Sequence, residues 1–379
     1  MSKKALLVTR VSGFVPQFEM NNVRILQEMG YEVHYAANYN TVVYGEDNTR
    51  LADTGIRRHS IHFCRSPFSF AVWRSYKELV QLMLEEKFDL VHCHMPITGV
   101  LARKAAEKVR RMTGRRAKVI YTAHGFHFFD GAPPGNWLYY FPERHYARYT
   151  DKLILINQED YERGSHFPVR GSVEFVPGVG MKPMPESNPG FNLRDQYGIP
   201  QDHRIVISVG ELTEAKNQTA LVHAMDRFRR EKLTCLICGA GAMKESLDQE
   251  IKEMYLQDKV ILAGYCNNIP DMLRQSDYYA FPSQREGLSV ALMEAMQAGL
   301  PVMAADIRGN HDLIQDGEGG FLFMENLPED YAGALAYFMK YPDEAERMGR
   351  WNQKQVENFS LDVVEKRMRE IYADEQGEC

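Results

Sequence analysis

Short apolar runs alternate with helical patterns along most of the chain. One helical pattern covers residues 15–29, directly after the first apolar run. Alternation of this kind predicts βαβ units and parallel sheets. The runs expected to form strands are KALLVT, YEVHYAA, FDLVHCH, AKVIYTAH and KLILIN in the first half, and HRIVISVGE, LTCLICGAG, DKVILAGY, DYYAFPS and LPVMAAD in the second half.

The two series of strands are separated by VPGVGMKPMPESNPG, residues 176–190, where proline and glycine interrupt both helix and strand. The pattern therefore predicts an α/β protein with two Rossmann-like, doubly wound parallel-sheet domains whose strand ends face a shared cleft. We expect a first domain over residues 1–180, a linker over 181–190 and a second domain over 191–359. Ser360 is suited to cap a final amphipathic helix over 360–379.

Composition agrees with a globular protein of two domains. The chain has 379 residues, of which 44% are apolar and 25% charged. The first apolar run, residues 5–8, is too short for a signal peptide or a membrane span, so we expect a cytoplasmic protein. Cys235 and Cys238 form a C-x-x-C inside an expected buried strand, and no second pair of ligands is placed to complete a metal site.

Charge is distributed unevenly about a net charge of −6. Residues 103–118 carry eight basic side chains and one acid, which suits either a solvated helix face or a patch for an anionic membrane surface. Residues 136–149 mix aromatic side chains with Arg144 and Arg148, which suits either core packing or a membrane interface. Nucleic acid is not an expected partner, because the chain is acidic overall and has no basic groove interleaved with aromatic residues.

Two glycine-containing loops follow strands in the second half. In SVGELTEAKNQ the strand ends at Gly210, and Lys216 precedes a helical pattern that starts near Gln218, an arrangement suited to binding an anion. The segment CGAGAMKESL is similar, but Lys244 stands where a dinucleotide-binding fingerprint has its third glycine. A dehydrogenase is therefore disfavoured.

The segment REGLSVALMEAMQAGLP contains two carboxylates, Glu286 and Glu294, in an otherwise apolar context. On one continuous helix they would point about 80° apart, so both could not lie on its apolar stripe. Glycine and turn residues place the helix start near Leu288 or Ser289, which leaves Glu286 in the preceding loop. Glu294, inside the helix, needs polar partners if it is buried, and sugar hydroxyls would serve.

The segment EGLSVALMEAM resembles the E-x7-E motif of the family-4 retaining glycosyltransferases with the GT-B fold. The resemblance covers nearly the whole chain, and its other segments are GELTEAKN, GYCNNIPDML, AGLPVMAADIRGN, VHCHMPITGVLARKAA and TAHGFHFFDGAPPGNW. It implies transfer of a sugar from a nucleotide-sugar, with retention of configuration and without a metal or other cofactor. UDP is the expected nucleotide, from its frequency in the family.

The first-domain segments resemble the branch that builds capsular polysaccharide, exopolysaccharide or O-antigen. That branch implies a saccharide acceptor, in particular one linked to polyprenyl diphosphate. It also implies a protein that works at the inner face of the cell membrane, with the final helix crossing back to the first domain.

The resemblance also implies roles for individual residues. Glu294 matches the residue that binds the ribose hydroxyls, Glu286 the one that holds the donor sugar, and Lys216 the one that contacts the diphosphate. His124 approaches the transferred sugar, and Gly13 lies beneath the phosphates. The remaining donor-binding positions are Gly210, Cys266, Ile269, Gly287, Leu288 and Ser289, of which Cys266 and Ile269 border the base.

One departure from the family concerns the phosphates. Glu211 stands five residues before Lys216, where the family commonly has an arginine, so Arg285, Arg308 or Arg10 is expected to supply the missing contact. No D-x-D motif is present to hold a metal there.

Three other functions stay open. Paired carboxylates also suit a glycoside hydrolase, a nucleotide-sugar epimerase has a related architecture, and a non-catalytic subunit could bind the same donor.

Overall fold

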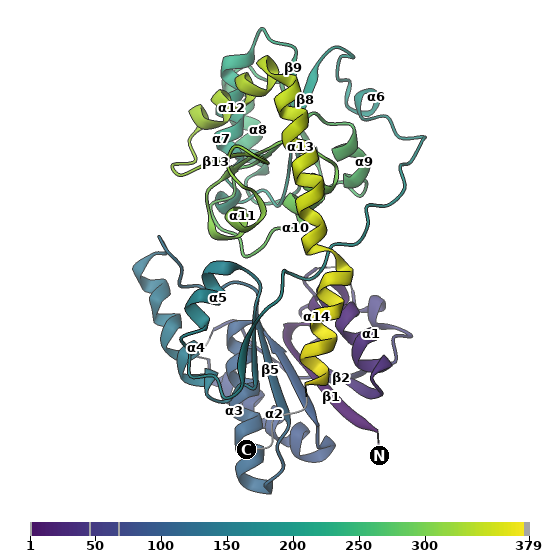
Figure 1. The fold of residues 1–379 in the computed structure, drawn as a ribbon, viewed down its shortest axis with the longest axis vertical. Coiled ribbons are helices and arrows are strands. Elements are labelled where there is room, and N and C mark those ends of the chain that lie inside the picture. Colours follow the sequence, from purple (N-terminus) through teal and green to yellow (C-terminus); the bar gives the residue numbers. More distant parts are fainter. Residues whose placement is uncertain (1, 45–46, 67–68, 375–379) are drawn as a thin grey trace. The chain divides into compact units, whose positions relative to one another are not determined.

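The computed structural model describes residues 2–44, 47–66 and 69–374 and divides into two units (Figure 1). Unit 1 comprises Met1–Gly180 and Leu361–Cys379, and unit 2 comprises Met181–Ser360. Residues 182–188, between the two series of strands, form neither helix nor strand. Each unit contains one parallel sheet with helices on both faces, as the alternating sequence pattern predicts.

Unit 1 contains a seven-stranded parallel sheet in the order β3-β2-β1-β4-β5-β6-β7. Its elements are β1 (Lys3–Val11), η1 (Val15–Glu19), α1 (Met20–Glu28), β2 (Tyr31–Asn38), η2 (Thr49–Leu51), β3 (Arg57–Ser60), α2 (Phe70–Glu86), β4 (Leu90–His94), α3 (Pro96–Thr113), β5 (Lys118–Ala123), η3 (Pro134–Tyr139), α4 (Tyr140–Ala147), β6 (Lys152–Leu155), α5 (Gln158–Gly164), β7 (Ser172–Phe175) and α14 (Leu361–Ala373).

Unit 2 contains a six-stranded parallel sheet in the order β10-β9-β8-β11-β12-β13. Its elements are α6 (Leu193–Tyr197), β8 (Arg204–Val209), η4 (Glu214–Lys216), α7 (Gln218–Ala224), η5 (Met225–Phe228), β9 (Leu233–Cys238), α8 (Lys244–Glu253), β10 (Val260–Gly264), α9 (Ile269–Arg274), β11 (Tyr278–Phe281), α10 (Val290–Gln297), β12 (Val302–Ala305), α11 (Arg308–Leu313), β13 (Gly320–Phe323), α12 (Pro328–Lys340), α13 (Pro342–Val356) and η6 (Glu357–Phe359).

Strand β1 illustrates why central strands read as continuous apolar runs. Leu6 and Val8 pack into the apolar cluster on one face of the sheet, whereas Ala5 and Leu7 pack into the cluster on the other face. Successive side chains of a strand point to opposite faces, and helices cover both. Every residue from 5 to 8 is therefore buried.

The order of strands reverses once in each sheet, at β1–β4 in unit 1 and at β8–β11 in unit 2. In doubly wound sheets the loops diverge at this switch point and leave a crevice at the carboxyl ends of the strands. We therefore expect the functional residues in the loops that follow β1, β4, β8 and β11.

The C-terminal helix α14 packs on unit 1, beside α1 (Figure 1). The Tyr372 hydroxyl lies 2.8 Å from Nδ1 of His92, and Lys118 Nζ donates a 2.6 Å hydrogen bond to the carbonyl of Ile371. The helix expected over 360–379 is observed from Leu361 to Ala373, and residues 375–379 of that segment lie outside the described residues.

Two local details differ from the sequence-based expectation. The helix expected over residues 15–29 begins as a π-helical turn, η1, before it continues as α1. Strands β3, β7 and β13 were not expected, and each lies at an edge of its sheet. Over the described ranges, no helix combines the length and the apolar character needed to cross a bilayer.

Candidate functional site

Lys216 and Glu286 meet at the switch point of unit 2. Lys216 ends η4, after β8, and Glu286 lies in the loop after β11. Because β8 and β11 are neighbours in the sheet, these loops lie together, and the Lys216 ammonium forms an ion pair with the Glu286 carboxylate. Ser283 also donates a 2.6 Å hydrogen bond to Oε1 of Glu286. The sequence had singled out both charged residues but not Ser283.

The start of α11, the helix that follows β12, contacts the loop that carries Glu286. Nε of Arg308 donates a 3.1 Å hydrogen bond to the carbonyl of Glu286. At the next position, a Cβ atom on Gly309 would lie 2.1 Å from the carbonyl oxygen of Gly287, so only glycine fits there. Of the three arginines considered in place of an arginine at 211, Arg308 donates to this loop, Arg285 belongs to the loop itself, and Arg10 belongs to β1 of unit 1.

Glu294 lies in α10, whose first turn is capped by the Ser289 hydroxyl, 3.3 Å from the amide nitrogen of Leu292. The Glu294 side chain is partly buried, and this burial raises the pKa of its carboxyl group. Within the described part of the chain, no hydrogen bond or ion pair is recorded for this carboxylate. A partly desolvated carboxylate without a protein partner is suited to accept hydrogen bonds from a ligand.

Tyr279, in β11, relates the two carboxylates to each other. Its hydroxyl is buried and has no hydrogen-bond partner among the described residues. Burial raises the pKa of this hydroxyl, and the negative charges of Glu294 and Glu286 raise it further. Both carboxylates of the E-x7-E segment therefore act on one buried hydroxyl group.

The other predicted donor-binding positions of unit 2 lie at the carboxyl ends of its strands. Gly210 follows β8, and a Cβ atom there would lie 3.8 Å from Cδ of Lys216. Cys266 follows β10, with its sulfur 3.5 Å from the Tyr197 hydroxyl, and Ile269 begins α9. Leu288 and Ile269 are partly buried against the same apolar cluster. The parallel sheet thus places Gly210, Lys216, Cys266 and Glu286 at the same end, where the strands have their carboxyl termini.

Gly13 follows β1 in unit 1 and allows a close approach of two backbone segments. Its amide donates a 2.8 Å hydrogen bond to the carbonyl of Val42, and a Cβ atom on Gly13 would lie 1.9 Å from the carbonyl oxygen of Val43. The glycine is therefore required by packing inside unit 1. A role beneath phosphates stays a prediction.

His124 follows β5 and lines a cavity of about 200 Å³ within unit 1. Its Nε2 lies 3.1 Å from Nδ1 of His94, and its ring packs edge-on against Phe14 with centroids 5.1 Å apart. Burial lowers the pKa of His124 to about 4. The imidazole is therefore neutral near pH 7 and can donate or accept a hydrogen bond.

Glu19 is a buried carboxylate beside His124 that sequence analysis missed. Its Oε1 lies 3.6 Å from Nδ1 of His94 and 3.8 Å from Nε2 of His124. Burial raises the pKa of Glu19 to about 7. The spacing of Val15, Glu19 and Val23 was a usable signal, because residues four apart share one helix face and both valines are buried.

Among the described residues, two groups of side chains have the composition of a metal site. Ligand atoms of Glu19, His92 and His94 lie within 4.8 Å of one another, as do those of a second group, His34, His59 and Glu86. In the first group both ring nitrogens of His92 already have protein partners, since they lie 2.8 Å from the hydroxyls of Tyr372 and Thr122. His92 thus does not fit as a ligand without losing a hydrogen bond.

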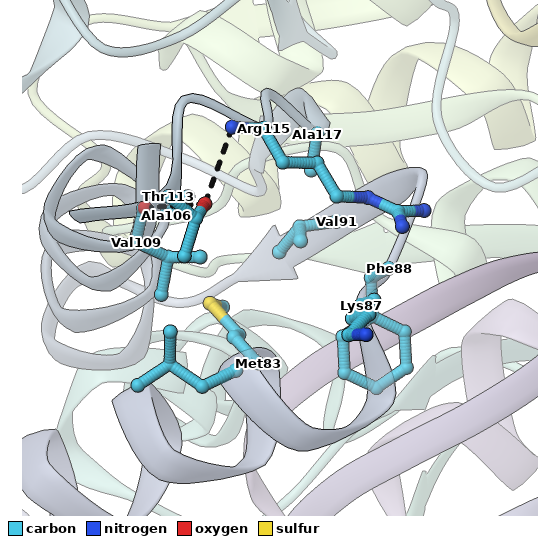
Figure 2. Close-up of a pocket in the computed structure, with 10 residues that line it drawn as sticks. Met83, Lys87, Phe88, Val91, Ala106, Val109, Thr113, Arg115 and Ala117 are labelled. Carbon is cyan, nitrogen blue, oxygen red and sulfur yellow. Dashed lines mark hydrogen bonds between the residues drawn. The ribbon is translucent and has the colours of Figure 1, made fainter. Parts of the chain in front are cut away.

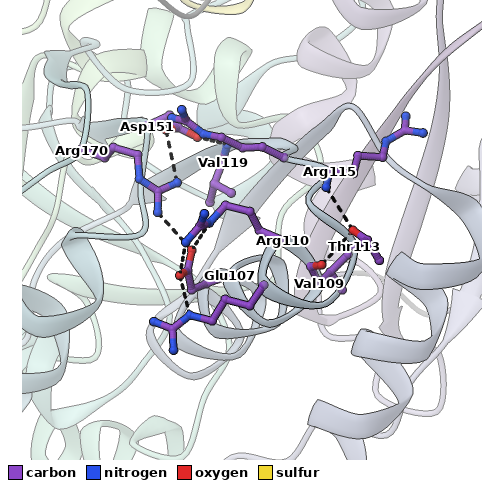
Figure 3. A network of polar contacts seen from close by, with 10 residues as sticks. Glu107, Val109, Arg110, Thr113, Arg115, Val119, Asp151 and Arg170 are labelled. Atoms are coloured by element: carbon purple, nitrogen blue, oxygen red, sulfur yellow. Dashed lines mark hydrogen bonds and ion pairs between the residues drawn. The ribbon is translucent and has the colours of Figure 1, made fainter. Parts of the chain in front are cut away.

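The basic stretch over residues 103–118 is largely neutralised by carboxylates within unit 1, and a role in binding an anionic membrane surface stays a prediction. Arg103 is fully buried and paired with Glu143 at 2.8 Å, and Lys118 is also buried. Glu107 pairs with both Arg110 and Arg111, each at 2.8 Å (Figure 3).

The rest of this network lies at the amino ends of β5 and β6. Asp151 forms an ion pair with Arg170 (Figure 3) and another with Arg116. Arg115 pairs with Asp89 at 2.7 Å. Among the eight basic residues of the stretch, Lys104 and Lys108 alone are exposed without a recorded carboxylate partner in the described part of the chain.

A small apolar cavity of about 80 Å³ lies at the opposite end of the unit 1 sheet from His124 (Figure 2). Met83, Phe88, Val91 and Val109 line it, near the amino ends of β4 and β5. Sites in doubly wound sheets form at the carboxyl ends of strands. This cavity is therefore a packing defect and not a candidate substrate site.

Comparisons with known proteins identify the family to which the chain belongs. Residues 20–178 match the family described as Glycosyltransferase Family 4, and residues 191–355 match Glycosyl transferases group 1. The chain is 32% identical to the putative glycosyltransferase EpsD of Bacillus subtilis, over 98% of this chain and 97% of that protein. It is 30% identical to the UDP-Gal:alpha-D-GlcNAc-diphosphoundecaprenol alpha-1,3-galactosyltransferase of Escherichia coli, over 72% of each.

Among solved structures, the chain resembles Anabaena HepE in complex with UDP and glucose, with a TM-score of 0.79 and 18% identity, covering 98% of this chain and 100% of that one. This likeness concerns the fold. The resemblance inferred from the E-x7-E segment is confirmed by the family matches and by the relatives that span both units. The chain belongs to the family-4 glycosyltransferases with the GT-B fold.

Proposed function

We propose that this enzyme transfers a sugar from a UDP-sugar, with retention of configuration, to a saccharide carried on polyprenyl diphosphate, in surface polysaccharide synthesis. Support comes from two relatives, at 32% and 30% identity, one named EpsD and the other named for a UDP-sugar donor and a diphosphoundecaprenol acceptor. Such an acceptor would place the enzyme at the inner face of the cell membrane.

The observation that carries the donor assignment is the Lys216–Glu286 ion pair at the switch point of unit 2. A bound donor gives both residues of the ion pair a new partner. The Lys216 ammonium contacts the diphosphate, and the Glu286 carboxylate accepts hydrogen bonds from sugar hydroxyls. Ser283 remains in place to orient Glu286. We assign the second phosphate contact to Arg308, because it lies against the Glu286 loop whereas Glu211 cannot bind an anion.

Glu294 binds the ribose hydroxyls in this proposal. Its partly buried carboxylate lacks a recorded protein partner in the described residues, and hydroxyl donors would stabilise its charged form. Cys266 and Ile269 border the base from the end of β10, while Gly210, Gly287, Leu288 and Ser289 shape the loops around the phosphates and sugar. Gly13 is assigned to the loop beneath the phosphates.

The chemical step breaks the bond between the anomeric carbon and the diphosphate, so the enzyme must stabilise charge that grows on the diphosphate. Lys216 and Arg308 provide that charge stabilisation in the proposal. No D-x-D motif accompanies them, so we propose that transfer needs no metal. Neutral His124 contacts the transferred sugar by hydrogen bonding.

Three competing functions make different predictions about products. A glycoside hydrolase would release sugar from simple glycosides, and an epimerase would convert the donor without an acceptor. A non-catalytic subunit would bind the donor and leave it unchanged. Product analysis with and without acceptor separates all three from a transferase.

A thermal-shift screen tests the donor assignment. A ligand that binds the native state alone stabilises it by RT ln(1 + [L]/Kd), so the matching nucleotide-sugar raises Tm. UDP-sugars should raise Tm in wild type and have little effect in Glu294→Gln. A larger shift with GDP- or ADP-sugars would overturn the choice of UDP.

A further inference from the structure

An apolar groove of about 530 Å³ runs along α3 in unit 1. Its walls include Val72 from α2, Ile97, Val100 and Leu101 from α3, and Leu138 and Pro142 from η3 and α4. The volume lies within the range of sites for small ligands, and its lining is mostly apolar. Nothing in the donor assignment uses this groove.

The groove adjoins the cavity that contains His124. Pro96, Tyr139 and Glu143 line both. A ligand with one polar end and one apolar end could therefore place the polar end beside His124 and the apolar end along α3. This is the chemical order of a saccharide joined to a lipid chain.

The charges along the groove suit an anionic linkage between those two parts. Glu143 is already neutralised, because it pairs with buried Arg103 at 2.8 Å and accepts a 2.9 Å hydrogen bond from the Tyr121 hydroxyl. The Lys104 side chain is exposed, and its recorded contact in the described residues is with the Tyr76 ring, at 4.9 Å. The cation is thus available to a diphosphate.

Lys104 also lies at a suitable place along the helix. It follows Pro96 by two turns of α3, a distance of about 12 Å at the usual rise per residue. Val72, Leu138 and Tyr146 line the groove from neighbouring elements, so the prenyl chain can lie across the groove from Lys104 while the saccharide extends into the His124 cavity.

The outer rim of the groove is apolar and exposed. Leu138, which lines the groove, is 71% exposed. Phe141 precedes the lining residue Pro142 and is 67% exposed, and Trp73 follows the lining residue Val72 and is 63% exposed, with Lys77 Nζ 3.4 Å from its ring centroid. Exposed aromatic side chains next to lysines are typical of surfaces that meet a lipid headgroup region. A lipid longer than the groove can continue from this rim into a bilayer.

We propose that the α3 groove binds the prenyl chain of the lipid-linked acceptor, with Lys104 beside its diphosphate. The proposal rests on the proposed function, from which it takes the class of acceptor. It assigns the specificity for a lipid tail to a surface of unit 1 that is separate from the donor loops of unit 2.

Kinetics with two acceptors test the groove. The probes are α-D-GlcNAc-diphosphoundecaprenol and the same GlcNAc diphosphate on a short water-soluble alkyl chain. Leu138→Gln and Lys104→Gln alter exposed side chains, so both variants should fold. Matched controls are Met112→Gln, exposed and outside the groove, and Lys108→Gln, one turn beyond Lys104.

Each buried CH₂ contributes about fourfold in affinity. Leu138→Gln should therefore raise KM for the undecaprenol acceptor at least about tenfold, with kcat unchanged and with little effect on the short-chain acceptor. Lys104→Gln should raise KM for both diphosphates. Equal losses for both acceptors with Leu138→Gln, or no loss with either variant, would overturn the proposal.

Photo-crosslinking gives a readout that does not need turnover. Undecaprenyl diphosphate with a diazirine on its chain should label residues 96–104 and 135–146 in the wild-type protein. Labelling elsewhere rejects the groove. Labelling of these segments without transfer to any acceptor supports the groove and rejects the proposed function, which distinguishes the two failures.

Vesicle sedimentation separates a groove from a general membrane-docking face. Phosphatidylcholine vesicles with and without phosphatidylglycerol should bind wild type and Leu138→Gln alike. Loss of vesicle binding in Leu138→Gln, together with unchanged KM for the undecaprenol acceptor in detergent, would show that the rim serves membrane docking and that the groove does not hold the chain.

Discussion

Lys216 donates to the Glu286 carboxylate, and the hydroxyl of Ser283 holds the same carboxylate oxygen. In the proposed function Lys216 contacts the leaving diphosphate and Glu286 contacts the sugar. The ion pair therefore keeps each charged group compensated until a donor replaces its partner, so that neither charge lies unpaired in a partly buried site.

Lys216→Ala should lower kcat about 10²–10³-fold at saturating donor, comparable with deletion of one preorganised donor that stabilises developing negative charge. Steady-state kinetics with the matching UDP-sugar measure the effect. Lys252→Ala removes an exposed lysine of α8 and should leave kcat unchanged. Turnover of Lys216→Ala equal to that of the control would remove Lys216 from the mechanism.

Gly309→Ala should displace the Glu286 loop, because the added Cβ would meet the carbonyl oxygen of Gly287 at 2.1 Å. We expect kcat/KM to fall at least about tenfold and stability to fall by about 1–3 kcal/mol, as for other overpacked sites.

Gly333→Ala is the matched control. A Cβ atom there meets nothing within 4 Å, and the position lies inside α12. Helix propensity favours alanine by about 1 kcal/mol, so this control should be slightly more stable than wild type and fully active. Equal activity of both glycine variants would show that contact between the loops does not matter.

Glu294→Gln should weaken binding of the UDP-sugar and should stabilise the folded protein at pH 7. The pKa of Glu294 is raised in the folded state by burial, so the native protein holds this proton more tightly than the unfolded chain. Stability therefore falls as pH rises from the unfolded pKa through the folded one. Glutamine carries no such cost, so the variant should have a higher Tm than wild type at pH 7 and a similar Tm at pH 4. Its Kd for the UDP-sugar should rise at least about tenfold, as expected when hydrogen bonds to a charged group are lost. A lower Tm at pH 7 would contradict this account.

Glu19→Gln should remove a pH dependence of stability. Burial raises the pKa of Glu19 to about 7 from an ordinary value of 4.5, beside the neutral rings of His94 and His124. Wild type should lose stability between about pH 4.5 and 7, as the unfolded chain releases a proton that the native state retains. The free energy of unfolding, measured with urea at several pH values in this window, should depend less on pH for Glu19→Gln than for Glu85→Gln. The second variant is a control that alters an exposed carboxylate of α2. An identical pH dependence of the free energy of unfolding in the two variants would argue against the raised pKa of Glu19.

The central strands were predictable because burial on both faces demands continuous apolar runs, as in residues 5–8. The edge strands β3 and β7 were not, since RRHS and SVEF are mostly exposed or partly buried and lack such a run. The same limit applies to β13, GFLF, where three of the four residues are partly buried. An edge strand has one neighbour and partial cover, so its composition approaches that of a loop.

Candidate site residues could be predicted where they belong to a local sequence pattern. Glu286, Glu294 and Lys216 followed from local strand–loop–helix patterns. The position of Ser283 beside Glu286 and that of Glu19 beside His124 depend on tertiary packing. Glu19 lies about a hundred residues from His124 in sequence and approaches it because β1, β4 and β5 are neighbours in the unit 1 sheet. The ion pairs of the basic stretch could not be predicted for the same reason, because its partners Glu143, Asp151 and Asp89 come from other parts of the chain.

The most direct test of the central claim follows a labelled sugar from a UDP-sugar to α-D-GlcNAc-diphosphoundecaprenol, in the presence of EDTA, and determines the anomeric configuration of the product by NMR. A panel of UDP-sugars is needed because the donor sugar depends on the shape around Glu286 and His124. The account predicts that one α-configured donor yields an α-linked lipid product, and that Lys216→Ala yields about 10²–10³ times less. Label that appears as free sugar or as an epimerised nucleotide-sugar, with none in the lipid product, would contradict it.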